Sequence, residues 1–387
     1  MSARAVAPSA SASPTAADMR EAVADLLPLV EAHAVPNERA RRILPDVADA
    51  LRPSGVFRMY VPGVYGGPEI DPITGIDIVA ALSEADAATG WCVSIAAMTS
   101  HIAGVLEPHW ARTVFGDPMS IACGAFAPNG KAIAVDGGHR VDGRWQWGSG
   151  SQLSNWLTGG VITEEGQFQL MLLPTPEVEI LDTWYSMGLQ GTGSHDFVAR
   201  GVVVPTGRSV HMGHARPVVD AAIARLSLFV LFSGGVASVL IGIARRAIRE
   251  LTDLANTKKP AQSSKTLAMS SQVQIDVAKA EAIVRSCYAY LVDEVATAWE
   301  VVLRGDRLEV EHRLRARLAA SHVGVECCRA VDLVYNAGGG SSVFASSPLQ
   351  RCFRDAHTAS AHIMVSARAF ETTGRHRFGQ EIDLSNL

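Results

Sequence analysis

The spacing of apolar residues changes twice along the chain. From Ala17 to about Asp117, and again from Val218 onward, apolar residues recur at the intervals that give a helix one buried face. Between Ser120 and about Val210, short alternating runs are divided by Gly, Asp and Pro, as in strands joined by hairpin turns. Strands and helices alternate along a doubly wound α/β chain, and this sequence lacks that alternation. We therefore expect an α+β fold that is mainly α.

The same pattern predicts individual elements. Strong breakers in the run Val61 to Pro68 separate two helices of the first region. The expected helices are Met19 to Ala34, Asn37 to Leu51, Ile76 to Leu106, Leu226 to Leu254, Val273 to Leu303, Glu309 to Ala337 and about Pro348 to Thr372. The expected strands include Ile133 to Val135, His139 to Val141, Trp145 to Trp147, Gln169 to Leu173 and Val202 to Val204. The expected domains are a disordered tail rich in Ala, Ser and Pro (1–15), an N-terminal helical domain (16–118), a middle β domain (119–215) and a C-terminal helical bundle (216–387).

Composition limits the classes of partner. A formal net charge of -5 gives no overall basic field that would attract nucleic acid or an anionic membrane, so we expect neither. The six cysteines are scattered without metal-ligand spacing, which is typical of reduced thiols in a cytoplasmic protein. The first residues lack the continuous apolar core of a secretory signal. The most apolar stretch, Leu226 to Ala244, is interrupted by Ser and Gly and flanked by arginines, so we expect a buried helix there.

The run Arg354-Asp355-Ala356 carries the first chemical signal. It is similar to the start of the catalytic helix of the acyl-CoA dehydrogenases, in which a Glu nine residues after the Arg removes a proton next to a thioester. Here that position is Ile363, which cannot accept a proton, while the neighbouring His362 changes charge near neutral pH. The exchange resembles the flavin-dependent two-component monooxygenases that are built on the same fold and use reduced flavin and O2.

Further motifs follow in the order of that family. The run Val61-Pro62 with Tyr65-Gly66-Gly67 is similar to a loop near the family's N-terminus, and Gly137 to Trp156 resembles its central strands. The run Pro348 to Arg351 resembles the start of its final helix. The resemblance implies the acyl-CoA dehydrogenase fold, with an N-terminal helical domain, a middle β-barrel-like domain and a C-terminal four-helix bundle. Such proteins commonly form homotetramers, as dimers of dimers, through the bundle.

The segment from Trp145 to Ser151 is the expected flavin contact. In dehydrogenases of this fold, a Trp followed two residues later by a Thr approaches the flavin, and the Thr hydroxyl bonds near flavin N5. Trp147 and Ser149 match that pattern, so the resemblance implies the same contact for the Ser149 hydroxyl. Alternate residues of a strand point to one face, so both side chains could address one ligand, and Gly150 would allow close approach of the backbone. The alternative is a hairpin with an ordinary buried Trp and a solvated Ser.

Histidines and aromatic residues complete the expected substrate site. The resemblance implies that His362 faces flavin and substrate as a base, for a phenol or for the proton of a flavin hydroperoxide; a structural His is the alternative. On a continuous helix, Asp355 would share the face of His362. His101 could orient a substrate hydroxyl or be a packed His at a helix end. Trp91 and Phe126 could form an apolar wall for a planar ligand or belong to the core.

Two segments of the C-terminal half are the expected contacts of the flavin phosphate. Lys258 and Lys259 lie where the family places such residues, sometimes in a neighbouring subunit; a solvated surface pair is the alternative. Gly339 and Gly340 resemble a Gly-rich turn that approaches the flavin. Neither a Walker loop nor a Rossmann fingerprint accompanies them, which indicates that the chain does not itself hold NAD(P)H. A separate NAD(P)H:flavin reductase is the expected source of reduced flavin.

The resemblance implies the oxygenase component of a two-component flavin-dependent monooxygenase. Such an enzyme would use reduced FMN, with FADH2 as an alternative, and O2 through a flavin C4a-(hydro)peroxide to hydroxylate an aromatic, phenolic or polyketide-like substrate. N-oxygenation of an amino sugar and S-oxygenation of a thiophene-type substrate are alternatives on the same fold. An acyl-CoA dehydrogenase is disfavoured, because the second position at which some members carry Glu falls on Ala224. A catalytically silent scaffold is the alternative from another class, and Ser149 and His362 weigh against it.

Overall fold

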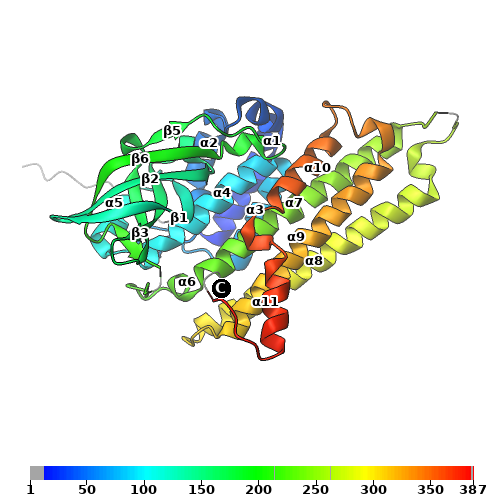
Figure 1. Cartoon of the computed structure of the whole chain (residues 1–387). Helices are drawn as coiled ribbons and strands as arrows, with labels where there is room; N and C mark the ends of the chain where they lie inside the picture. Colours follow the sequence, from blue (N-terminus) through cyan, green and yellow to red (C-terminus); the bar gives the residue numbers. More distant parts are fainter. Residues whose placement is uncertain (1–12, 213, 262, 385–386) are drawn as a thin grey trace, which may run out of the picture.

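The chain folds in the helical, β, helical order that its hydrophobic pattern predicts (Figure 1). The computed structural model describes residues 13–212, 214–261, 263–384 and 387. The expected fold class, α+β and mainly α, is confirmed. Residues 1–12 of the expected tail lie outside the described residues, and the domain limits at residues 118 and 215 stay predictions.

Polar caps fix where the first helices begin. These helices are α1 (Ala16–Ala40), α2 (Pro45–Leu51), α3 (Pro72–Ala85), α4 (Ala87–Ser100) and α5 (Pro108–Phe115). At the start of α1, the side chains of Thr15 and Asp18 each accept a hydrogen bond from the other's backbone N–H, which forms a capping box. The carboxylate of Asp71 accepts hydrogen bonds from the first N–H groups of α3 in the same way.

Two helix boundaries differ from the prediction. The single helix expected from Ile76 to Leu106 is wrong, because Asp86 takes an extended backbone and its carboxylate caps a new helix, α4. The helix expected from Asn37 to Leu51 is wrong as well. Arg41 ends α1 in the left-handed region (φ 51°), and α2 starts afresh after it.

In the part of the middle region that the structure describes, the strands form one seven-stranded sheet. Its strands are β1 (Ala122–Val135), β2 (Gly138–Gly148), β3 (Trp156–Thr163), β4 (Phe168–Pro174), β5 (Glu179–Leu181), β6 (His195–Pro205) and β7 (Ser209–His211). Their order is β5-β6-β2-β1-β3-β4-β7, and β1 and β3 pair in parallel while the other neighbours are antiparallel. The expected strand segments all lie within β1, β2, β4 or β6 and are confirmed.

Long helices make up the C-terminal region. They are α7 (Leu228–Thr257), α8 (Ser271–Leu303), α9 (Val310–Ala337) and α10 (Pro348–Ala359), with the shorter α6 (Ala222–Arg225) and α11 (Arg368–Arg377). Figure 1 shows α7 to α10 as an elongated bundle on one side of α3 and α4, with the sheet on the other side. By length and composition α7 could cross a membrane, but 72% of its most apolar 18-residue window is buried in the protein. The expectation of a buried helix is confirmed.

The expected final helix from Pro348 to about Thr372 is wrong in its middle. α10 ends before His362, a 3₁₀ turn follows at Ile363–Val365, and α11 starts after it. His362 has an extended backbone (φ -70°, ψ 138°), which interrupts the helix, and the buried guanidinium of Arg317 in α9 donates hydrogen bonds to the first two carbonyl groups of the turn that follows. Asp355 and His362 consequently lie on different elements, and their spacing does not place them on one face.

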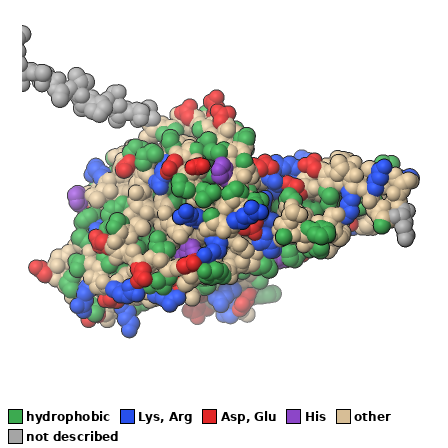
Figure 2. Space-filling model, turned by 90° about the horizontal axis from the view of Figure 1, so that it is seen from above, with side chains coloured by type: hydrophobic (Ala, Val, Ile, Leu, Met, Phe, Trp, Pro, Cys, Tyr) green, Lys and Arg blue, Asp and Glu red, His purple; other side chains and the backbone are tan. Residues whose placement is uncertain are grey.

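Acidic and basic side chains are interspersed on the face shown in Figure 2, without a continuous patch of one sign. This face therefore has no strong field of one sign that would attract a polyanion.

Candidate active site

Ser149 lies just beyond the end of β2, where the backbone turns sharply. Trp147 has a left-handed backbone (φ 64°) and its side chain is 64% exposed, whereas Ser149 is only 5% exposed. The pairing of β2 with β6 also shifts register next to Trp147. The expectation that both side chains share one strand face is therefore wrong, because strand alternation stops before Ser149. At Gly150 (φ 71°) a Cβ would lie 3.1 Å from the sulfur of Cys123, so this turn favours glycine.

The Ser149 hydroxyl connects α4 with the segment that precedes β6. The indole Nε1–H of Trp91 donates to Ser149 Oγ at 3.0 Å. The hydroxyl of Ser194 lies 2.7 Å from the same oxygen. The Gly150 N–H donates to the carbonyl of Thr192 at 3.0 Å, which ties the two segments together a second time. Trp91 is thus buried, as a core residue would be. Its indole also bonds directly to Ser149, the residue that we expect to contact the flavin.

Aromatic contacts join Ser149 to His362. The ring of His362 lies 5.5 Å from that of Trp91, edge to face, and 5.2 Å from that of Phe232, measured between centroids. The Phe232 ring lies 5.7 Å from that of Phe126. We call Trp91, Phe126, Ser149, Phe232 and His362 the His362 cluster. Its members come from α4, β1, the end of β2, α7 and the turn after α10, and all of them except Phe232 are residues that the sequence suggested separately.

His362 has a neutral ring that accepts a hydrogen bond in this structure. Its Nδ1 accepts a hydrogen bond from the N–H of Met364 at 3.2 Å, so the ring proton lies on Nε2. Burial lowers the pKa of His362 to about 4, and the nearby cation of Arg317 acts in the same direction. The imidazole is therefore uncharged at neutral pH. An Nε2–H suits the polarisation of a substrate oxygen better than the proton removal expected from the sequence.

Arg317 holds the turn that carries His362. Its side chain is 4% exposed, and it donates to the carbonyl groups of Met364 and, at 3.2 Å, of Ile363. Within the described part of the chain its guanidinium makes no ion pair, and burial lowers the pKa of Arg317 to about 10. A buried cation near His362 stabilises negative charge that develops on a ligand there.

Asp355 ties α10 to the segment between β5 and β6. Its carboxylate accepts a hydrogen bond from the N–H of Leu189 at 2.6 Å, and burial raises the pKa of Asp355 to about 7. The neighbouring Arg354 donates to the carbonyl of Met187 at 2.6 Å. The Arg-Asp pair of the sequence motif therefore anchors a loop, and it does not enter the His362 cluster.

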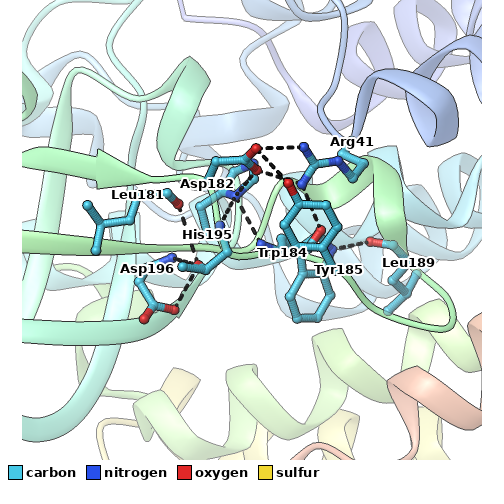
Figure 3. A network of polar contacts seen from close by, with 9 residues as sticks. Arg41, Leu181, Asp182, Trp184, Tyr185, Leu189, His195 and Asp196 are labelled. Carbon is cyan, nitrogen blue, oxygen red and sulfur yellow. Dashed lines mark hydrogen bonds and ion pairs between the residues drawn. The ribbon is translucent and has the colours of Figure 1, made fainter.

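Figure 3 shows how the same segment is attached at its other end. Arg41 pairs with Asp182 through the two terminal nitrogens of its guanidinium, at 2.6 and 2.9 Å. The ring nitrogen Nδ1 of the buried His195 accepts from the backbone N–H of Trp184 at 3.2 Å. The indole of Trp184 donates to the carbonyl of Leu189 at 3.0 Å. These bonds hold the segment between β5 and β6, which ends at Ser194, the hydrogen-bond partner of Ser149.

His101 lies at the end of α4, and its ring already has a hydrogen-bond partner in the protein. Its buried Nε2–H donates to the carbonyl of Ile223 at 3.0 Å. Burial lowers the pKa of His101 to about 4, so the ring is neutral. The structure thus places it as a packed helix-end histidine, and a role in substrate binding stays a prediction.

The expected phosphate contacts lie together at the far end of the bundle. Lys258 Nζ donates to the carbonyl of Gly338 at 2.8 Å, which brings it to the turn that contains Gly339 and Gly340, while Lys259 is exposed. Phe232 and Lys258 flank most of α7, and a helix rises about 1.5 Å per residue, so they lie roughly 40 Å apart. One flavin cannot reach both ends within a single chain.

Three contributors were not predicted from the sequence. Phe232 and Arg317 lie inside long helices, where a single apolar or charged residue carries no signal of its own. Ser194 stands in the run Gly191-Thr192-Gly193-Ser194, whose two hydroxyl residues alternate with glycines and could have marked a turn with a polar function.

The site has the features that a flavin needs. The indole of Trp147, two residues before the buried Ser149, is held exposed on a left-handed backbone and offers a planar face to a ligand. The position of the dehydrogenase base is Ile363, which is 42% exposed, so no carboxylate occupies it. In the described residues, no group of three or more His, Cys, Asp or Glu is placed to hold a metal ion. A reduced flavin bound here would supply the two electrons that an oxygenase needs.

Comparison with known proteins leads to the same class. The family described as acyl-CoA dehydrogenase, C-terminal domain, matches residues 234–367. The indole-3-acetate monooxygenase of Pseudomonas putida is 31% identical over 351 residues, which cover 89% of this chain and 89% of that protein. The crystal structure of 3-HSA hydroxylase from Rhodococcus sp. RHA1 has a TM-score of 0.90 at 25% identity and covers 96% of this chain and 99% of its own. The structure of XiaF from Streptomyces sp., in complex with FADH2 and glycerol, has a TM-score of 0.86 at 25% identity, and the match covers 95% of this chain and 96% of the XiaF chain.

Fold, site and relatives together define a flavoprotein oxygenase on the acyl-CoA dehydrogenase scaffold. The chain belongs to the family of flavin-dependent monooxygenases with this fold, and the resemblance seen in its sequence is confirmed.

Proposed function

We propose that this chain is the oxygenase component of a two-component system that hydroxylates a phenolic or polyketide-like aromatic compound. A separate reductase supplies reduced FMN. One atom of O2 enters a C–H bond of the substrate, the other leaves as water, and the flavin leaves oxidised. The observation that carries the proposal is the His362 cluster, in which a neutral imidazole and a buried hydroxyl are joined by aromatic rings.

The polar groups of the cluster suit a phenol. The Nε2–H of His362 donates to the substrate oxygen, and the buried cation of Arg317 stabilises the phenolate form. The rings of Trp91 and Phe232 offer edges and faces to a planar ligand. Neither Ile363 nor Ala224 provides the carboxylate that a dehydrogenase of this fold uses, so proton removal next to a thioester is not supported.

We further propose that two copies of the chain share each flavin, within a homotetramer in the cytoplasm. The support is the separation of roughly 40 Å between the two halves of the expected flavin site, which a second copy packed on the bundle can bridge. Ser149 of one copy and Lys258 of the next would then contact the same cofactor.

Reconstitution tests the proposed function. The purified chain, NADH, FMN, O2 and a panel of phenols, indoles, amino sugars and thiophenes are combined with and without an unrelated NADH:FMN reductase, and products are identified by mass spectrometry. Catalase is present throughout, so that hydrogen peroxide from free flavin makes no product. We expect ring hydroxylation that depends on the reductase. Turnover with NADH alone would contradict the two-component assignment, and N-oxides or S-oxides as the sole products would overturn the aromatic substrate class.

A further inference from the structure

A row of buried hydroxyl groups leads from Ser149 away from the His362 cluster. Ser149 Oγ lies 2.7 Å from Ser194 Oγ, which lies 2.6 Å from the hydroxyl of Thr192. The Thr192 hydroxyl lies 2.8 Å from the carbonyl oxygen of Leu189. At the other end, the indole of Trp91 bonds Ser149 Oγ at 3.0 Å. We call Ser149, Ser194 and Thr192 the hydroxyl chain; all three side chains are buried.

The two ends of the hydroxyl chain fix the direction of every hydrogen bond in it. A carbonyl oxygen can only accept, so Thr192 donates its single proton to Leu189 and must accept from Ser194. Ser194 has then used its proton and must accept from Ser149. An indole N–H can only donate, so Ser149 accepts from Trp91. The proton of Ser149 therefore points toward Ser194, and its oxygen keeps one unused acceptor site.

The acceptor end of the chain is held rigidly. The N–H of Leu189 donates to Asp355 at 2.6 Å, and the carbonyl of Leu189 also accepts from the indole of Trp184 at 3.0 Å (Figure 3). Leu189 itself adopts a left-handed backbone (φ 50°), a conformation that a non-glycine residue keeps only when its surroundings enforce it. The carbonyl therefore cannot turn away from Thr192 without breaking these contacts.

We propose that Thr192 and Ser194 are positioning residues that make Ser149 an acceptor, and not a donor, toward the bound cofactor. The proposal rests on the proposed function and on the contact near flavin N5 that the sequence resemblance implies for the Ser149 hydroxyl. Reduced flavin carries an N5–H that an acceptor can bind, whereas N5 of oxidised flavin is itself an acceptor and finds no proton on Ser149. The hydroxyl chain thereby makes the site selective for the reduced form, through residues that do not touch the cofactor.

Two substitutions at Thr192 separate this role from a packing role. Thr192→Val keeps the shape but removes the hydroxyl, so Ser194 loses its acceptor, turns its proton to Ser149, and leaves the Ser149 proton to point at the ligand. Thr192→Ser keeps the hydroxyl and serves as the matched control. Dissociation constants of FMN are measured by titration for the oxidised form and, anaerobically, for the reduced form. We expect Thr192→Val to lower the preference for reduced over oxidised FMN by roughly 2- to 13-fold, the worth of one ordinary hydrogen bond, and Thr192→Ser to retain it.

The same titrations in a Ser149→Ala background complete the test. Without the Ser149 hydroxyl, Thr192→Val should leave the preference unchanged, because its effect passes through Ser149. An equal preference for reduced over oxidised FMN in the parent, Thr192→Ser and Thr192→Val proteins would overturn the inference and leave the proposed function standing. A parent protein that binds neither form of FMN would contradict the proposed function and the inference with it. Neutron diffraction of the parent gives a reading that needs no flavin: a deuteron of Ser149 directed at Ser194 supports the chain, and one directed elsewhere overturns it.

Discussion

Asp355 should make the protein less stable as the pH rises toward neutrality. Burial raises its pKa from the ordinary value of 3.8 to about 7 in the folded protein. Between these values the folded state holds a proton that the unfolded state has lost, so the free energy of unfolding falls as the pH rises through this window and is constant above it. At about 1.36 kcal/mol per pH unit the full effect is about 4 kcal/mol, and about 3 kcal/mol of it falls between about pH 5 and about pH 8.

Asp355→Asn tests this reasoning. The amide carries no charge at any of these pH values, and its oxygen can still accept the hydrogen bond from the Leu189 N–H. Urea unfolding of the parent and the variant is compared at about pH 5 and about pH 8. Between these pH values, we expect the free energy of unfolding of the variant to fall by about 3 kcal/mol less than that of the parent. Asp49→Asn, the same chemical change at an exposed carboxylate, is the control and should follow the parent. Parallel pH profiles for the parent and Asp355→Asn would refute the assignment of a buried, protonated Asp355.

Three further predictions follow from the site. His362→Phe should lower product formation by about 10²–10³-fold, while His362→Gln, which keeps an N–H donor, should retain more activity; because the pKa of His362 is about 4, the parent protein should show no activity step near neutral pH that belongs to this residue. Arg317→Met should leave the buried carbonyl of Met364 without its arginine donor and destabilise the protein by about 1–3 kcal/mol, with faster hydrogen exchange at residues 360–366, and Arg317→Lys should lose less; unchanged exchange would contradict the anchoring role. Mixed subunits of Ser149→Ala and Lys258→Ala should recover activity in roughly a quarter of their sites if two copies share each flavin, and no recovery after subunit exchange would contradict that sharing.

Long-range patterning predicts the fold well because it averages over many residues. The helical, β, helical order depends on apolar spacing through whole regions, and single exceptions do not change it. Boundaries depend on single polar residues instead. Asp86 divides an expected helix by capping a new one. The expected final helix breaks at His362, beside a turn that Arg317 of a distant helix holds, and no local pattern reveals that contact.

The candidate site divides in the same way. His362 and Ser149 could be selected because they stand at motif positions in the expected order along the chain. The tautomer and pKa of His362, however, depend on the N–H of Met364 and on the packing around the ring, which only the folded chain defines. The strand argument for Trp147 failed because a register shift and a left-handed residue at the end of β2 interrupt the alternation that it assumed.

The most direct test of the central claim is a single turnover with labelled oxygen. The protein is mixed anaerobically with reduced FMN and the best substrate of the reconstitution panel, then exposed to ¹⁸O2 in the presence of catalase, and the product is analysed by mass spectrometry. We expect one ¹⁸O atom in the product, in an amount that depends on the protein and is sharply reduced in His362→Phe. Product that carries oxygen from water, or labelled product formed equally well by His362→Phe, would contradict an oxygenase that works through the His362 cluster.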